Sequence, residues 1–263
     1  MDLGLKGRVA IVAAASKGLG RAVAEELARE GANVAICART ASDLETVAAN
    51  IRSSTGRDVF HQAVDVTDHA SITKFVAAVA ERFGRIDICV TNSGGPPSKS
   101  FAATNPQDWH AAVNLLLMST IYFAKETLPR MQQNKWGRFI TITSSAVKQP
   151  VDGLLLSNSI RSAVTGLART LANEYAAHGI TVNNVCPGYT CTARLDGLAA
   201  TISQRTGSSA EQVFADWTRQ IPAGRLGTPQ EFAALVAFLA SDRAGYINGT
   251  SIAVDGGMVR SLL

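Results

Sequence analysis

The chain of 263 residues is 46% hydrophobic and 17% charged, which suits one large globular domain rather than two half-sized ones. Its net charge of +4 is too small, and its basic residues too scattered, to indicate a nucleic-acid-binding protein. No stretch is apolar enough for a membrane span and the N-terminus does not resemble a signal peptide, so we expect a cytoplasmic protein that binds no membrane. The cysteines include no CxxC pair and no histidine at ligand spacing, so no metal site is predicted; they are Cys37, Cys89, Cys186 and Cys191.

The chain begins with a strand, a glycine turn and a helix. Val9–Val12 is an uncharged run of β-formers, as expected for a strand buried on both faces. Gly18-Leu19-Gly20 then opens a helical pattern. This order directs backbone N–H groups and a helix N-terminus at a phosphate, because glycine lets the chain approach closely. A tight turn without a ligand has the same pattern, so the motif alone leaves both interpretations open.

Strands and helices alternate along the rest of the chain. The further strands are predicted at Val34–Cys37, His61–Val66, Ile86–Thr91, Phe139–Thr143, Thr181–Val185 and Ser251–Val254. Helices are predicted from a Ser42–Glu45 capping box, from Asp68, and over Asn105–Gln132, Ser157–Ala177, Ala193–Thr218 (broken by Gly207, with a Ser208–Glu211 capping box) and Pro229–Ser241. Such alternation predicts an α/β fold of the Rossmann type, a doubly wound parallel sheet of about seven strands with helices on both faces. We expect a single domain over residues 1–263, with 193–218 as helices that cover the substrate.

A ligand of such a sheet lies beyond the carboxyl ends of the strands, where the strand order switches. The loops after the first, fourth, fifth and sixth strands meet there. After the fourth strand comes the turn cluster Asn92-Ser93-Gly94-Gly95-Pro96-Pro97, and after the sixth comes Pro187-Gly188.

Cationic residues near two of the strand ends favour a phosphorylated dinucleotide. Arg39 directly follows the second strand, where an acidic residue would bind a ribose 2′-hydroxyl and an arginine suits a 2′-phosphate. Lys17 adds a second positive charge in the glycine loop, so NADP(H) is expected unless both are ordinary solvated cations. Asp65, at the end of the third strand, either accepts a hydrogen bond from the adenine amino group or caps the next helix.

Two further polar positions have a possible chemical role. Asn114 lies inside a long predicted helix, where Asn is a mediocre helix former, so it either diverts a backbone hydrogen bond to water or faces solvent. Ser144 and Ser145 end the fifth strand, and a hydroxyl there can donate to a substrate carbonyl. Serine is also common where a strand ends in a turn, because its hydroxyl can bond to the nearby backbone.

Over nearly its whole length the chain resembles the short-chain dehydrogenase/reductase family, and most closely its 3-oxoacyl-carrier-protein-reductase branch. The matching motifs are Ser16-Lys17-Gly18-Leu19-Gly20, Asp65-Val66, Thr91-Asn92-Ser93-Gly94, Asn114, Ser144, Pro187-Gly188 with Thr190 and Thr192, Gly224-Arg225-Leu226-Gly227-Thr228-Pro229, Tyr246-Ile247-Asn248-Gly249 and Val254-Asp255-Gly256-Gly257. The cofactor-binding residues that the patterns and the resemblance together give are Ala14, Ser16, Lys17, Gly18, Leu19, Gly20, Arg39, Asp65, Val66, Asn92, Ser93, Gly94, Arg161, Pro187, Gly188, Thr190 and Thr192.

The chain departs from the family pattern in the glycine loop and at both catalytic positions. The family's glycine loop usually begins Thr-Gly and here begins Ala13-Ala14, so the turn must accommodate a Cβ. The family's catalytic Tyr follows its Ser by thirteen positions, which leads from Ser144 to Ser157. Its Lys comes four positions later, where this chain has Arg161. We therefore interpret the chain as an atypical member that lacks the catalytic Tyr and Lys.

In the mechanism that the resemblance implies, Tyr gives a proton to the carbonyl oxygen while NADPH gives hydride to the carbon. The Lys holds the nicotinamide ribose and lowers the Tyr pKa. Ser157 is a far weaker acid, and Arg161 can hold the ribose but cannot relay a proton. Loss of one general acid typically slows a reaction by about 10²–10⁴-fold, so slow or altered chemistry is expected.

Another group is then needed for proton transfer. Tyr189 is the best candidate, ahead of Lys99, Lys148 and Asp152, because it follows Pro187-Gly188 on a loop at the pocket. The alternative for Tyr189 is an aromatic lid that contacts cofactor or substrate. The catalytic set expected is Ser144, Asn114 (ordering a water), Ser157, Arg161 and Tyr189.

The sequence supports three alternative hypotheses of function. The first is an NADP(H)-dependent reductase of a carbonyl or β-ketoacyl substrate, and the second is a catalytically impaired dinucleotide-binding sensor or partner subunit. A non-redox lyase or isomerase on the same fold is the third. The resemblance implies a homotetramer, packed in part through Ser157–Ala177 and Thr250–Val259 here, and an acyl carrier protein as a possible partner through Lys135.

Overall fold

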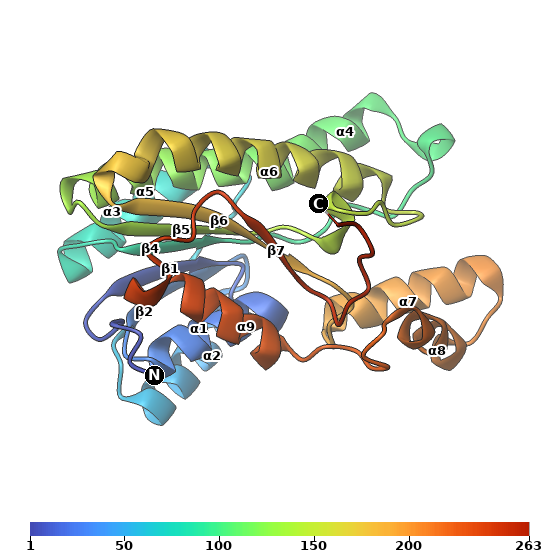
Figure 1. Cartoon of the computed structure of the whole chain (residues 1–263), viewed down its shortest axis with the longest axis horizontal. Coiled ribbons are helices and arrows are strands. Elements are labelled where there is room, and N and C mark those ends of the chain that lie inside the picture. The colour runs from blue at the N-terminus through green and yellow to red at the C-terminus, as the bar shows by residue number, and fades with distance from the viewer. Residues whose placement is uncertain (263) are drawn as a thin grey trace.

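The structure, a computed structural model, describes residues 1–262. Within them the strands form one parallel, seven-stranded sheet in the order β3-β2-β1-β4-β5-β6-β7 (Figure 1). The strands are β1 (Val9–Ala13), β2 (Asn33–Ala38), β3 (Val59–Ala63), β4 (Ile88–Thr91), β5 (Gly137–Ile142), β6 (Ile180–Pro187) and β7 (Ser251–Val254). The order reverses between β1 and β4, so the predicted doubly wound Rossmann-type sheet is confirmed.

Helices cover both faces of the sheet (Figure 1). On one face lie α1 (Gly18–Arg29), α2 (Ala41–Thr55) and α9 (Pro229–Leu239), and on the other lie α3 (His69–Phe83), α5 (Ser119–Gln133) and α6 (Leu155–Tyr175). The sheet separates two cores, because alternate side chains of each strand point to opposite faces. Val12 and Ile36 pack under α1 and α9, whereas Ile11 and Phe139 pack under α3 and α5. This explains why the central strands are continuous apolar runs rather than alternating patterns.

The remaining helices lie at the ends of the sheet. The short helix α4 (Pro106–Ala112) begins with a full capping box between Asn105 and Asp108. Helices α7 (Ala193–Thr206) and α8 (Ala210–Gln220) extend away from the sheet and share a small core of their own around Leu195 and Trp217 (Figure 1).

The long helix predicted over Asn105–Gln132 is interrupted. Between α4 and α5 the backbone forms a π-helical segment, Val113–Met118, in which the Ser119 N–H donates to the Asn114 carbonyl five residues earlier. The Asn114 side chain leaves the helix and its Nδ2 donates to the Thr67 carbonyl at 3.4 Å. The long helix is therefore interrupted by a widened turn at Asn114, whose side chain bonds the Thr67 carbonyl.

The two predicted capping boxes, Ser42–Glu45 and Ser208–Glu211, are wrong in position. Helix α2 starts at Ala41, because Thr40 already has extended backbone and forms the boundary, so Ser42 and Glu45 lie inside the helix. Helix α8 is capped by Ser209, whose Oγ accepts the Gln212 N–H at 3.2 Å, one residue later than predicted. The N-cap is the last residue with extended backbone before the helix. When several Ser or Thr residues are adjacent, the sequence does not show which of them has that conformation.

Several element boundaries also shift by one to three residues. The third strand ends at Ala63 rather than Val66, because its partner β2 ends at Ala38. Helix α6 starts at Leu155, which places Ser157 within its first turn rather than at its start. The other strands and helices differ from the predicted ranges only at their termini, as their bounds above show.

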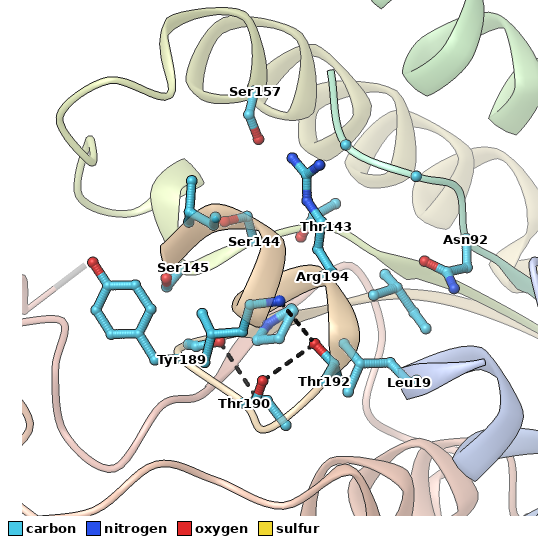
Figure 2. Close-up of a pocket in the computed structure, with 18 of the residues that line it drawn as sticks. Leu19, Asn92, Thr143, Ser144, Ser145, Ser157, Tyr189, Thr190, Thr192 and Arg194 are labelled. Atoms are coloured by element: carbon cyan, nitrogen blue, oxygen red, sulfur yellow. Dashed lines mark hydrogen bonds between the residues drawn. The ribbon is translucent and has the colours of Figure 1, made fainter. Parts of the chain in front are cut away.

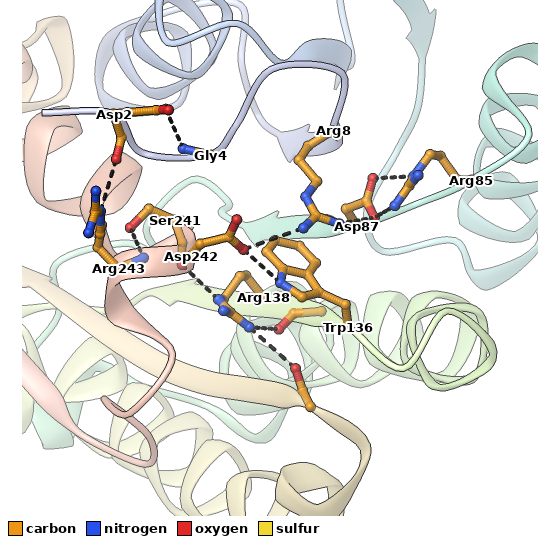
Figure 3. Close-up of polar contacts among 12 residues, drawn as sticks. Asp2, Gly4, Arg8, Arg85, Asp87, Trp136, Arg138, Ser241, Asp242 and Arg243 are labelled. Atoms are coloured by element: carbon orange, nitrogen blue, oxygen red, sulfur yellow. Dashed lines mark hydrogen bonds and ion pairs between the residues drawn. The ribbon is translucent and has the colours of Figure 1, made fainter.

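A cluster of charged and aromatic side chains joins four segments at the amino-terminal edge of the sheet (Figure 3). Asp87 is fully buried there, and its carboxylate accepts the Val9 N–H at 2.9 Å and two bonds from Arg85, at 2.6 and 2.8 Å. Arg8 adds an ion pair to Asp87 at 3.5 Å and stacks over the Trp136 ring at 3.7 Å. Asp242, which follows α9, accepts the Trp136 Nε1–H at 2.9 Å. This cluster, which we call the Asp87 cluster, therefore ties the start of β1 to the starts of β4 and β5 and to the segment after α9.

Two absences concern the described residues 1–262 alone. None of their helices combines the length and apolar character needed to cross a bilayer. They contain no group of three or more His, Cys, Asp or Glu side chains placed to hold a metal ion.

Three of the four free cysteines are buried, and burial raises the pKa of Cys37 to about 12.

Candidate cofactor and active site

A cavity of about 330 Å³ opens at the carboxyl ends of the strands, beside the point where the strand order reverses (Figure 2). Its walls come from the loops after β1, β4, β5 and β6 and from the starts of α6 and α7. The sequence-predicted site residues that line it are Ala14, Lys17, Gly18, Leu19, Asn92, Ser93, Gly94, Ser144, Ser157, Arg161, Pro187, Gly188, Tyr189, Thr190 and Thr192.

The turn after β1 is tightly built. Ala14 has a φ of 50°, a left-handed conformation that favours glycine, and Gly18 has a φ of 57° where α1 begins. A Cβ at Gly20 would collide with the Ala14 carbonyl oxygen, so the helix can approach the turn this closely only with glycine. As a result the first N–H groups of α1 lie at the cavity, where a helix N-terminus favours an anion.

The loop after β6 closes the cavity from the opposite side. A Cβ at Gly188 would come within 2.6 Å of the Asp255 Cβ, so glycine is required for the chain to pass. Thr190 then turns the chain, and Thr192 caps α7 by accepting the Leu195 N–H at 3.4 Å (Figure 2). Two helix N-termini, those of α1 and α7, therefore lie at the same cavity.

Two serine hydroxyls line the cavity from neighbouring elements. Ser144 follows β5, and its Oγ accepts the Ala146 N–H at 3.1 Å, which leaves the hydroxyl proton for a further acceptor. Ser157, in the first turn of α6, is nearly buried and directs its hydroxyl into the cavity (Figure 2). Among the described residues Ser157 has no hydrogen-bond partner for that hydroxyl.

Arg161 lies one turn further along α6. Its Nη1 donates to the Ile142 carbonyl at 2.9 Å, which fixes the guanidinium beside the end of β5. Burial, together with the positive charge of Arg194, lowers the pKa of Arg161 to about 10. The guanidinium keeps four of its five N–H groups for other acceptors.

Tyr189 forms an aromatic wall with Trp217 of α8. The two rings stack with centroids 4.8 Å apart. Burial raises the pKa of Tyr189, and the negative charge of Asp152 raises it further, so the phenol gives up its proton less readily than a free tyrosine. Of the two alternatives for Tyr189, this environment favours the aromatic wall over the proton donor. The other candidates are further off: Lys99 pairs with Asp108 at 2.8 Å, and neither Lys99 nor Lys148 lines the cavity.

The structure does not bring every predicted site residue to the cavity. Those outside its lining are Ser16, Gly20, Arg39, Asp65, Val66 and Asn114. Asp65 accepts bonds from the Thr67 N–H and hydroxyl at 2.9 and 2.8 Å, which lowers its pKa, and Arg39 lowers it further. Asp65 does not cap α3, whose cap is Asp68. Arg39 is exposed at the end of β2, and Lys17 pairs with Asp43 at 3.0 Å.

Other residues at the cavity were not predicted from the sequence. The most consequential is Arg194, in the first turn of α7, whose Nη2 donates to the Pro96 carbonyl at 3.2 Å. Leu154, Leu198 and Met258 form an apolar wall toward a second, adjoining cavity of about 510 Å³. Arg194 lies in the segment 193–218 that the sequence marks only as a cover for the substrate.

Comparison with known proteins places the chain in a family. A family model described as Enoyl-(Acyl carrier protein) reductase matches residues 13–259. The short-chain reductase protein NovJ of Streptomyces niveus is 34% identical over 249 residues, 95% of this chain and 93% of NovJ. The 3-oxoacyl-[acyl-carrier-protein] reductase FabG of Salmonella typhimurium is 35% identical over 256 residues, 97% of this chain and 99% of FabG.

Solved structures agree with these relatives. L-sorbose reductase from Gluconobacter frateurii, crystallised with NADPH and L-sorbose, superposes with a TM-score of 0.94 and 30% identity over 100% of both chains. The sequence matches, the strand order and the cavity at the carboxyl ends of the strands lead to one conclusion. The chain belongs to the short-chain dehydrogenase/reductase family of oxidoreductases.

Proposed function

We propose that the protein is an NADPH-dependent reductase of a carbonyl or β-ketoacyl compound in which Ser157 and Arg161 stand where the family has Tyr and Lys. The observation that carries the proposal is the meeting of the α1 N-terminus, Ser144, Ser157 and Arg161 at one cavity. The reaction adds one hydride and one proton to the carbonyl and yields an alcohol and NADP⁺. Similarity to reductases, among them one crystallised with NADPH, supports it.

The residues present fit a dinucleotide. At Gly20 and Gly188 a side chain would collide with the turns that border the cavity, so both turns are built for close approach. The α1 N-terminus suits the pyrophosphate. Arg39 is exposed, forms no ion pair within residues 1–262 although its charge acts on Asp65, and stands in the position that suits a 2′-phosphate. Lys17, at the cavity, pairs with Asp43 at 3.0 Å.

NADPH supplies the hydride when bound, and the side chains of this chain orient the acceptor. The Ser144 hydroxyl, whose oxygen is already engaged by the Ala146 N–H, donates to the substrate oxygen. Arg161, held by the Ile142 carbonyl, holds the ribose and supplies positive charge near the developing oxyanion. Ser157 binds the same oxygen or a water, and the proton comes from solvent, because neither Ser157 nor Arg161 is an effective acid.

A titration with NADPH and with NADH, followed by cofactor fluorescence, tests the cofactor assignment. We expect stoichiometric NADPH binding and weaker NADH binding. Arg39→Gln should weaken NADPH binding by about 10- to 100-fold, as loss of one charge-assisted bond implies, and leave NADH binding unchanged. Equal affinity of wild-type protein for both cofactors would contradict the assignment of Arg39, and binding of neither would contradict the reductase.

One alternative is a dinucleotide-binding protein without turnover, which the replacement of Tyr and Lys by Ser157 and Arg161 favours. The Ser144→Ala variant separates the two functions once a carbonyl substrate has been found in a screen. A reductase loses turnover in this variant while its NADPH affinity stays within about threefold, since Ser144 contacts substrate. Turnover at the wild-type rate would show that Ser144 has no such role.

We also propose that the protein assembles as a homotetramer. Strand β7 is an edge of the sheet, and α6 exposes small residues such as Ala163 and Gly166, which allow close helix packing. An acyl carrier protein remains a proposed partner at Lys135, which is exposed in the turn before β5. Gel filtration with light scattering tests the assembly, and a stable monomer would contradict it.

A further inference from the structure

The side chain of Arg194 reaches across the cavity from α7 to the loop after β4. Its Nη2 donates to the Pro96 carbonyl at 3.2 Å. The neighbouring Gly95 makes room for it, because a Cβ at Gly95 would collide with the guanidinium. Figure 2 shows the guanidinium extending up the cavity in the direction of Ser157. The guanidinium thus lines the cavity, while Arg194 as a residue is exposed.

This end of the cavity has two positive charges and no negative one. Arg161 and Arg194 both line the cavity, and its lining contains no Asp or Glu. Within residues 1–262 neither arginine forms an ion pair, and each makes one hydrogen bond, to a backbone carbonyl. The two charges are close enough for Arg194 to lower the pKa of Arg161. Two guanidinium groups that line one cavity without a counterion favour the binding of an anion there.

The anion has two possible sources, the pyrophosphate of the cofactor and the substrate. Lys17 and the N-terminus of α1 are already at hand for the phosphates of the cofactor. Arg161 lies instead at the end of β5, next to the Ser144 and Ser157 hydroxyls that we assign to the substrate oxygen. The nicotinamide and its ribose carry no negative charge, so the cofactor leaves the two arginines uncompensated at this end.

We propose that Arg194, with Arg161 beside it, binds a carboxylate of the substrate, and that the substrate class is a carbonyl compound with a carboxylate close to the reacting carbon. This inference rests on the reductase function proposed above. A guanidinium offers two parallel N–H groups that match the two carboxylate oxygens, which fixes the orientation of the carbonyl as well as its affinity. The adjoining cavity, beyond Leu154 and Met258, holds the remainder of the molecule.

Matched pairs of acids and esters test the inference without knowledge of the natural substrate. The probes are pyruvate and acetoacetate with their methyl esters, each titrated into the protein–NADPH complex and followed by cofactor fluorescence. The wild-type complex should bind each acid more tightly than its ester. Arg194→Gln should reduce that preference by about 10- to 100-fold and change NADPH affinity by less than about threefold.

Arg219→Gln is the matched control. It removes one positive charge from the exposed face of α8, where Arg219 pairs with Asp216, and should leave the preference for acids intact. Wild-type protein that binds acids and esters equally, or neither, would overturn the inference. Loss of NADPH affinity in Arg194→Gln with an unchanged preference would assign Arg194 to the cofactor instead.

The same probes are then offered as substrates, with NADPH oxidation as the readout. This arm tests the reductase separately, because the acid preference is read from binding alone. Acids that bind through Arg194 but are never reduced would leave the carboxylate site in place and contradict the proposed reduction. Reduction of esters as fast as acids would retain the reductase and overturn the carboxylate site.

Discussion

At the scale of single residues, the backbone at Ala14 has the clearest consequence. A left-handed φ of 50° destabilises an alanine by about 1–2 kcal/mol, whereas glycine tolerates it. Glycine also raises the conformational entropy of the unfolded chain, which cancels about 0.5–1 kcal/mol of the stability gained when the strain is relieved. Ala14→Gly should therefore raise the free energy of unfolding by about 0.5–1 kcal/mol, measured by urea denaturation.

Ala13 provides the control for this prediction, because it ends β1 and its φ is not positive. Ala13→Gly should lower the free energy of unfolding, since the strand gains flexibility and relieves no strain. A loss of stability in both variants would show that the turn at Ala14 is not strained.

Single residues also mark the limit of what the sequence reveals about the site. Ser144, Ser157 and Arg161 were predicted by their spacing in a resembled family, and the structure places all three at the cavity. Arg194 was missed, because its place depends on α7 approaching the loop after β4, a contact between segments 98 residues apart. Gly95 reflects this contact, because a Cβ there would meet the Arg194 guanidinium. A glycine in a loop does not by itself reveal such a contact.

At the scale of elements, the start of α9 depends on pH through Glu231. Its carboxylate accepts bonds from Arg225 at 2.9 Å and from the Thr228 N–H at 2.8 Å, and these lower the pKa of Glu231 to about 2. A carboxylate with a lowered pKa stabilises the fold above its unfolded pKa, near 4.5, and loses that contribution as the pH falls toward 2. Glu231→Gln should therefore lower the Tm at neutral pH, with a difference from wild type that shrinks between about pH 5 and pH 2.

Thermal unfolding across this pH range measures the effect. Glu81→Gln is the control, because Glu81 is exposed on α3 and forms no ion pair within residues 1–262. Its Tm should follow the wild type at every pH. A constant difference between Glu231→Gln and wild type from neutral to acid pH would contradict the role of the Glu231 charge.

The elements themselves were predictable to different degrees. Most apolar strands and amphipathic helices were found within a few residues of their ends, because their patterns reflect burial against the sheet. The helix starts at Ala41 and Ala210 were misplaced, because each follows from local backbone conformation rather than from burial. The π-helical segment Val113–Met118 has only Asn114 as its sequence signal, and an Asn alone does not specify a widened turn.

At the scale of the whole molecule, the Asp87 cluster joins segments that are distant in sequence (Figure 3). The buried carboxylate receives bonds from Arg85 and the Val9 N–H, and an ion pair from Arg8. Asp87→Asn removes the charge and leaves these donors without their anion. The expected loss in the free energy of unfolding is about 1–3 kcal/mol, because hydrogen bonds to a buried charged group are weakened while Arg8 and Arg85 stay partly exposed to solvent.

Chemical denaturation measures this loss, with Asp58→Asn as the control. Asp58 pairs with Arg82 at 2.6 Å on the surface, where an ion pair is worth about 0–1 kcal/mol. Equal, small losses in the two variants would contradict a structural role for the Asp87 cluster. The sequence did not indicate this cluster, since its members come from four segments that only the sheet brings together.

The fold of the molecule as a whole was nevertheless predictable. Regular alternation of strands and helices permits few arrangements other than a parallel sheet with helices on both faces. The position of the cavity followed from the same rule, since the loops at the carboxyl ends of the strands meet where the order reverses. The charge inside the cavity did not follow, because it depends on which side chains turn inward.

Helices α7 and α8 have their own small core, separate from the two cores under the sheet. Helix α7 also provides one wall of the cavity, through Arg194, Leu195 and Leu198. The apolar side chains of this small core belong to neither core under the sheet, so substitutions among them should change the stability of the sheet little. On the function proposed above, changes within this wall would alter the choice of substrate at little cost to the stability of the sheet.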